Sequence, residues 1–266
     1  MGFKKSFSFI LLIFFTLLTL TSNIMFGQNK QPTLITDRPD QAESAETILP
    51  GFLQFETGFL FNKNTENANL VIKSYDIANT LLRIGLGKDI ELRIGNNLFS
   101  QISESSTNKI ITTGIGGLDL GTKFRIIKDL KNIPNISAII NFKLPVGKIN
   151  FSPKNIEPEI VLILSKDLTD IFSISANIGS ERISSDDVLE YFYSLAFGIS
   201  ISNKIGSYIE YYGSSSSIIS AVHKLDTGLI YIFKNNIQFD ISTGLDLKNG
   251  TSDWFISSGF SFRLPN

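Results

Sequence analysis

Apolar and polar residues alternate sharply over residues 81–95, and this stretch predicts a hairpin of two β-strands. In its first half, LLRIGLG, aliphatic residues from Leu82 onward alternate with Arg83 and Gly85. In its second half, IELRIG, they alternate with a glutamate, an arginine and a glycine. A period of two with so large a contrast indicates strands whose two faces meet different media.

The same pattern recurs to the C-terminus and predicts about twelve strands, most of them near the length of a tilted membrane-spanning strand. The expected strands are 51–61, 75–87, 89–100, 110–127, 134–146, 157–166, 170–180, 189–203, 205–214, 220–234, 236–246 and 253–263.

The connections between these strands alternate in length. Short turns, such as Gly87-Lys88-Asp89, alternate with longer polar segments, which include 62–74 and 101–109. Short periplasmic turns, long external loops and an even number of strands are typical of outer-membrane barrels. The even number also places both chain ends in the periplasm.

A soluble β-sandwich would alternate as well, but its polar face usually carries long charged side chains. Here the polar face is rich in glycine and serine, which suit the crowded interior of a narrow barrel. We therefore expect an all-β fold, an antiparallel transmembrane β-barrel with an up-and-down meander. The small residues are Gly58, Gly85, Gly95, Gly121, Gly198, Gly228, Gly244, Gly259, Ser173, Ser194, Ser200, Ser242 and Ser257.

The N-terminus has the features of a secretory signal. Lys4 and Lys5 precede a short apolar run, and polar residues return at Thr21. The run is too short for a typical spanning helix. We expect a signal peptide over residues 1–27 (an uncleaved anchor is the alternative), a periplasmic leader over 28–50 and the barrel over 51–266, in the bacterial outer membrane.

Composition excludes several classes of site. The chain has 266 residues, a net charge of −1, no cysteine and one histidine. This balance gives no basic patch for nucleic acid, and the lack of cysteine excludes disulfides, lipidated cysteine and thiolate metal sites. We expect no cofactor and no metal. The expected partners are outer-membrane lipid, the barrel-assembly machinery and an unidentified small-molecule solute, with no nucleic acid.

The leader and first strand, ITDRPDQAESAETILPGFLQFETGF, resemble the start of a bacterial outer-membrane family. That family is labelled "transporter" or a component of the meta-pathway of phenol degradation. Further matching stretches include NTLLRIGL, GIGGLDLGTKFRI and WFISSGFSFRL, and the T-D-R-P-D-Q spelling resembles members from Bacteroidota. The resemblance implies a barrel that transports hydrophobic or aromatic compounds, with no catalytic residues. One departure is that Phe262 is followed by four further residues, whereas such barrels commonly end on an aromatic residue.

Charged residues assigned to the inner face nearly cancel, which argues against a strongly ion-selective lumen. Opposed basic and acidic walls could orient dipolar solutes. Alternatively, the charges form a salt-bridge network that fills the barrel. They are Glu56, Glu91, Asp119, Glu159, Glu210, Asp226 and Asp240, and Arg83, Arg93, Lys123, Arg125, Lys143 and Arg263.

The leader motif Thr36, Asp37, Arg38 and Pro39 could belong to the same network. We hypothesise that the leader enters the lumen from the periplasmic end, with Asp37 and Arg38 pairing with strand charges such as Arg83, Glu91 or Arg93. The alternative is a flexible tail, since chain ends are often disordered.

Catalysis is not expected. His223 lies near Ser220 and Asp226, but a strand places Ser220 and His223 on opposite faces. The leading function is passage of small molecules, including hydrophobic or aromatic ones. The alternatives are a structural or surface-interaction barrel with a closed lumen and, third, a barrel-embedded lipid enzyme.

Overall fold

The computed structural model describes residues 33–67, 70–105, 108–128, 130–247 and 253–265. The predicted signal peptide over 1–27 and the first five residues of the leader lie outside the described residues. No helix within the described part of the chain is long and apolar enough to span a membrane.

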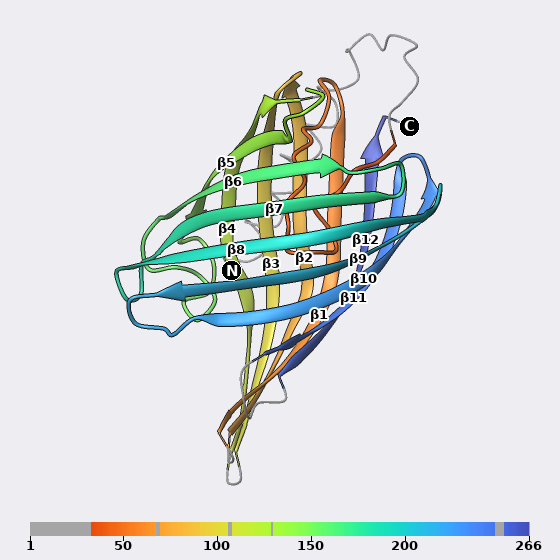
Figure 1. Ribbon diagram of the computed structural model, residues 1–266. Coiled ribbons are helices and arrows are strands. Elements are labelled where there is room, and N and C mark those ends of the chain that lie inside the picture. The colour runs from red at the N-terminus through yellow and green to blue at the C-terminus, as the bar shows by residue number, and fades with distance from the viewer. Residues whose placement is uncertain (1–32, 68–69, 106–107, 129, 248–252, 266) are drawn as a thin grey trace. The chain divides into compact units, whose positions relative to one another are not determined.

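Twelve strands form one closed antiparallel barrel in which each strand pairs with its neighbours along the chain (Figure 1). The predicted fold class is therefore confirmed. The strands are β1 (Leu53–Asn67), β2 (Leu70–Gly87), β3 (Ile90–Ser105), β4 (Lys109–Ile127), β5 (Asn135–Leu144), β6 (Glu157–Asp167), β7 (Phe172–Ile183), β8 (Val188–Ser202), β9 (Ile205–Ser216), β10 (Val222–Lys234), β11 (Ile237–Asp246) and β12 (Trp254–Leu264).

The barrel closes where the first strand pairs with the last. The β1–β12 ladder runs without interruption from Leu53↔Leu264 to Lys63↔Trp254. Closure leaves no sheet edge whose backbone N–H and C=O groups would be unpaired in lipid. This is the constraint that lets a sheet cross a bilayer.

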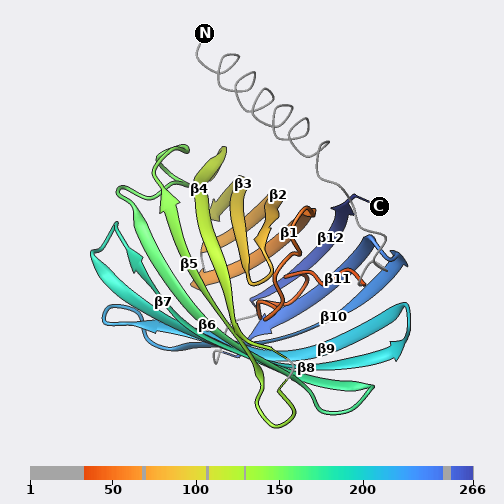
Figure 2. The same cartoon turned by 90° about the horizontal axis from the view of Figure 1, so that it is seen from above.

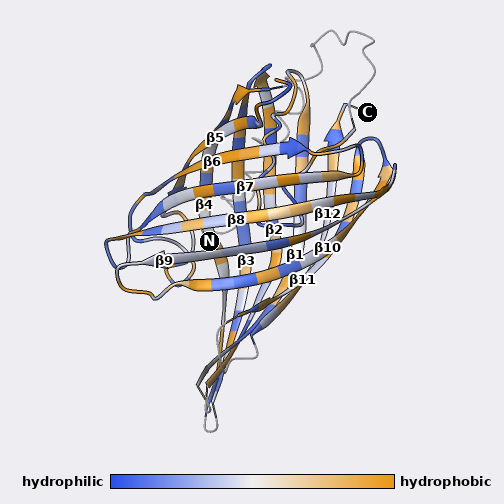
Figure 3. Ribbon diagram, in the orientation of Figure 1, coloured by the Kyte–Doolittle hydropathy of each residue, from blue (hydrophilic) through white to orange (hydrophobic). Residues whose placement is uncertain are grey.

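The two faces of the wall differ in polarity, and Figure 3 shows the hydrophilic and hydrophobic residues that follow one another along the strands. On β11, Gln238, Asp240 and Ser242 are buried, whereas Phe239 and Ile241 between them are exposed on the outside. Such alternation turns apolar side chains toward lipid and polar ones toward the enclosed axis.

Aromatic side chains gather on the outer face near both ends of the barrel. Near the short turns, the Phe239 ring lies 5.3 Å from Phe260, which lies 5.7 Å from Phe262. Toward the long loops, Phe61 lies 5.3 Å from Trp254 and 5.0 Å from Tyr75. These positions agree with the aromatic rims expected of a membrane barrel.

The first four strands are longer than predicted. Segments 62–74 and 101–109, which the polar sequence predicted to be loops, continue the ladders with pairs such as Asn62↔Ser74 and Ser103↔Ile110. The prediction was wrong because a hairpin outside the bilayer needs backbone pairing but no apolar face. Figure 1 shows these strands projecting beyond the others.

Replacing Leu229 with arginine tests which face meets lipid. Leu229 lies in the middle of β10 with 51% of its surface exposed, so Leu229→Arg should cost about 2–4 kcal/mol of stability in lipid vesicles. Urea unfolding in vesicles measures this cost.

Ile218→Arg is the matched control, because Ile218 is 58% exposed but lies between β9 and β10 rather than on the wall. It should leave the unfolding midpoint unchanged. Equal effects of the two substitutions would contradict a lipid-facing wall at Leu229.

Candidate functional site

The leader segment, here residues 33–50, folds into the barrel at the end that carries the short turns (Figure 2). The Leu34 N–H donates to the Asn235 carbonyl in the β10–β11 turn at 3.0 Å. Further on, the Ile48 N–H donates to Glu91 on β3 at 2.8 Å. The segment thus crosses the lumen from one wall to the opposite wall before β1 begins.

Three cations on three adjacent strands converge on one leader carboxylate, that of Asp37. Its Oδ2 atom lies 3.0 Å from Arg83 Nη1, 2.5 Å from Arg93 Nη1 and 2.9 Å from Lys123 Nζ. Arg83 and Lys123 are fully buried. Burial alone would raise the pKa of Asp37, but the three cations hold that pKa well below its usual range. The hypothesised pairing of the leader with Arg83 and Arg93 is therefore present.

Strand carboxylates complete the charge balance of this cluster. Glu91 binds Arg83 through two hydrogen bonds of 2.8 and 3.0 Å, and Glu56 lies 3.1 Å from the same guanidinium. The Asp37 N–H donates to Glu56 at 3.0 Å. Buried charges persist in a low-dielectric interior only when partners compensate them. The leader supplies part of that compensation.

The acidic wall formed by β9–β11 holds the other side of the leader. Arg38 lies 3.3 Å from Asp240 and donates to Ser257 at 3.0 Å. The Gln41 N–H donates to Glu210 at 2.7 Å. Burial, followed by repulsion from Glu210, raises the pKa of Asp40 well above its usual range.

Two paired glycines create the space that Arg38 occupies. Gly58 and Gly259 face each other across the β1–β12 ladder. A Cβ atom at Gly58 would lie 2.4 Å from Arg38 Cζ, and one at Gly259 would lie 2.3 Å from Arg38 Nε. Both distances are far inside van der Waals contact, so a side chain at either position would displace the arginine.

All thirteen strand charges predicted to face the lumen are buried or half-buried, and eight of them contact the leader. The eight are Glu56, Arg83, Glu91, Arg93, Lys123, Arg125, Glu210 and Asp240. Of the other five, Asp119, Lys143 and Glu159 lie nearer the long loops, Asp226 pairs in register with Glu210, and Arg263 lies over the Phe52 ring.

The leader motif is also ordered by side-chain bonds. Thr36 donates to the Arg38 carbonyl at 2.7 Å and accepts from Gln238 at 2.8 Å, while Pro39 is buried. Sequence reasoning overlooked two further leader carboxylates. Glu43 binds Arg93 at 2.8 Å, and Glu46 binds Arg125 at 3.1 Å.

The overlooked signal was a period of three. Leader positions 37, 40, 43 and 46 are all acidic, and the structure directs the carboxylates at 37, 43 and 46 toward the basic wall. Comparing this acidic repeat with the bases predicted on the second to fourth strands would have indicated that Glu43 and Glu46 also pair with the wall.

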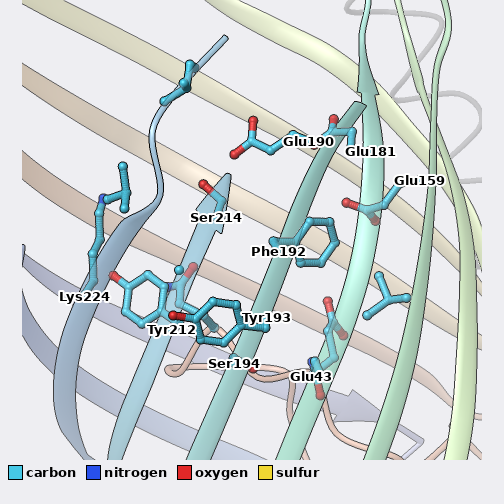
Figure 4. A pocket seen from close by; sticks show the side chains of 16 residues that line it. Glu43, Glu159, Glu181, Glu190, Phe192, Tyr193, Ser194, Tyr212, Ser214 and Lys224 are labelled. Atoms are coloured by element: carbon cyan, nitrogen blue, oxygen red, sulfur yellow. The ribbon is translucent and has the colours of Figure 1, made fainter. Parts of the chain in front are cut away.

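A cavity of about 520 Å³ lies between the leader and the long-loop end of the barrel (Figure 4). Gln41 and Glu43 of the leader form its floor, and the inner faces of β6–β10 form its wall. Side chains that extend into it include Glu159, Phe192 and Tyr212. The leader thus occupies only part of the lumen.

The residues considered for lipid hydrolysis are not assembled. His223 is exposed on the outside of β10, where its Nδ1 atom lies 2.6 Å from the Tyr193 hydroxyl and its ring stacks on Tyr211. Asp226 is buried on the inner face. Within the described residues, no group of three or more His, Cys, Asp or Glu side chains is placed to hold a metal ion.

Neutralising Asp37 should release the leader. In Asp37→Asn, Arg83, Arg93 and Lys123 lose their shared carboxylate, and breaking a buried pair costs about 3–5 kcal/mol. Hydrogen exchange of amides 37–48 measures the free energy of local opening. Asp187→Asn, which removes the partner of exposed Arg182, should leave leader exchange unchanged. Protection in Asp37→Asn equal to that of the parent would refute this role.

Leader docking should weaken as pH rises from mildly acidic values through neutrality. Burial, opposed in part by Arg93, raises the pKa of Glu43 from 4.5 to about 7, and Asp40 faces Glu210 and Asp226 with a raised pKa. Groups with a raised acid pKa hold protons more tightly when docked, so their contribution is lost as pH rises from about 4.5 through 7.

The depressed pKa of Asp37 acts in the opposite direction, and its contribution is lost only as pH falls below about 4. Exchange protection of amides 37–48, corrected for intrinsic pH dependence, should therefore decline between pH 5 and 8. Asp40→Asn should flatten the decline. Protection that increases over this range would show the assignment to be wrong.

Solved structures with a similar fold include outer-membrane proteins. An outer-membrane channel from Pseudomonas putida F1 aligns with a TM-score of 0.67 at 13% identity, covering 83% of this chain and 98% of its own. The translocator domain of the autotransporter NalP from Neisseria meningitidis aligns with a TM-score of 0.56 at 8% identity, covering 79% and 88%. No curated protein sequence matches the chain significantly. The family model described as "Putative MetA-pathway of phenol degradation" matches residues 36–264, and the chain belongs to that family.

Proposed function

We propose that this protein is a bacterial outer-membrane channel for small molecules, closed at its periplasmic end by the leader segment. The observation that supports this most directly is the cavity of about 520 Å³ inside a closed barrel with an apolar outer face. In outer-membrane barrels the short turns face the periplasm, so the leader would close that end and the cavity would face outward.

Many of the contacts that bind the leader to the wall are ion pairs with strand side chains. Such contacts suit a leader that closes the lumen and can be released from it. Asp37, Glu43 and Glu46 bind the bases of β2–β4, and Arg38 binds Asp240 on the opposite wall. The opposed charges of the two walls thus serve to hold the leader. These ion pairs support the interpretation of an internal salt-bridge network, and a transverse field that orients dipolar solutes stays a prediction.

Family membership supports small hydrophobic or aromatic molecules as the solute. The family description refers to phenol degradation, and the similar structure from Pseudomonas putida F1 is described as an outer-membrane channel. The apolar outer face would bind outer-membrane lipid, and the barrel-assembly machinery would insert the chain.

A surface-interaction barrel is a second candidate. Strands β1 to β4 project beyond the other strands, and their projecting ends would lie outside the cell. A catalytic role has no such support, because His223 and Asp226 lie on opposite faces of the wall.

Deleting residues 28–45 should open the channel. The chain with its leader should conduct weakly in a planar lipid bilayer, and the deletion should raise single-channel conductance severalfold because it removes Asp37, Arg38 and Glu43 from the lumen. A shorter deletion of residues 28–31 serves as the control and should conduct like the full leader. Conductance that is equally low in both deletions would favour the surface-interaction barrel.

A further inference from the structure

The cavity above the leader is lined by an excess of negative charge. Its side chains include Glu43, Glu159, Glu181 and Glu190, with Lys224 as the only lysine among its lining residues. This excess appears in Figure 4, where the carboxylates of Glu159, Glu181 and Glu190 lie on one side of the cavity and Lys224 lies on the other. An anionic solute would meet repulsion on that acidic side.

Two of these carboxylates are already neutralised by neighbours. Glu181 Oε1 lies 2.7 Å from Lys143 Nζ, and Glu43 binds Arg93 at 2.8 Å. By contrast, none of the ion pairs in the described part of the chain includes Glu159 or Glu190. Their charges are therefore available to a cation that enters the cavity.

Aromatic side chains supply an apolar surface beside these carboxylates. Phe192 projects from β8 into the middle of the cavity, and Tyr212 projects from β9 (Figure 4). Phe192 packs closely over Gly179 on β7, where a Cβ atom would lie 2.4 Å from the ring. The faces of such rings attract both apolar groups and cations.

We propose that this cavity binds an organic monocation, a protonated amine attached to a ring, with the ammonium group at Glu159 and Glu190 and the ring against Phe192 and Tyr212. This inference rests on the proposed channel function and specifies its solute class. A bare metal ion fits less well, because aromatic and aliphatic side chains such as Val161 and Val222 form part of the wall. The volume of about 520 Å³ is within the range of small-molecule sites.

The test compares three probes of similar shape and different charge. They are 2-phenylethylamine (protonated at pH 7.5), neutral 2-phenylethanol and anionic 3-phenylpropanoate, titrated calorimetrically into the full mature chain in detergent. We expect the amine to bind at least about tenfold more tightly than the other two probes. Equal or tighter binding of the anion would overturn the proposal.

Variants assign the binding to the cavity. Glu159→Gln should weaken amine binding about tenfold and leave the alcohol unchanged, whereas Phe192→Leu should weaken both probes. Glu104→Gln, the matched control, removes the same charge from β3 outside the cavity and should have no effect. Circular dichroism verifies that each variant is folded. Amine affinity unchanged in a folded Glu159→Gln variant would also overturn the proposal.

The binding experiment and the conductance experiment can refute their two proposals separately. Binding in detergent requires only the cavity, whereas conductance requires a continuous path through the barrel. Amine binding without conductance in the 28–45 deletion would retain the site and refute the channel. Conductance without selective amine binding would retain the channel and refute the site.

Discussion

Compensation of charge inside the barrel is the constraint on which the rest of the structure depends. Arg83 and Lys123 are fully buried in the wall, and a buried cation without a partner is strongly unfavourable. Strand carboxylates at Glu56 and Glu91 meet part of this need, and Asp37 meets the remainder by contacting three cations at once. The leader therefore belongs to the barrel, since the inner wall is electrostatically incomplete without it.

The same constraint explains why the two halves of the lumen differ. Near the short turns, the wall bases of β2–β4 face leader acids, and small residues such as Gly58 and Gly259 leave room for Arg38. Toward the long loops the leader is absent, and carboxylates such as Glu159 have no cation at ion-pair distance among the described residues. Where the leader ends, the lumen changes from a filled network to an open, acidic cavity.

How much the sequence predicts depends on how local each feature is. Alternation of apolar and polar residues is local, so it identified twelve strands and the residues on their inner faces. Arg83, Glu91 and Glu210 are among the residues that it assigned correctly. The hairpin extensions beyond residues 62 and 101 were missed because, outside lipid, nothing forces the outer face to be apolar. The contacts of Asp37 join positions up to 86 residues apart. The sequence raised pairing with Arg83 and Arg93 as a hypothesis, but no local pattern identified Lys123 as the third cation. The threefold spacing of leader acids was visible, but it acquires meaning only once the leader is known to lie against a basic wall.

Glu43 connects the two halves of the lumen. Its carboxylate binds Arg93 and Lys123 in the leader network, and it also forms part of the cavity floor. The wall bases compensate the charge of Glu43, so a cation in the cavity meets the charges of Glu159 and Glu190 instead. The side chain that ties the leader to the basic wall thus also closes one side of the cavity. Docking of the leader therefore helps to define the cavity itself.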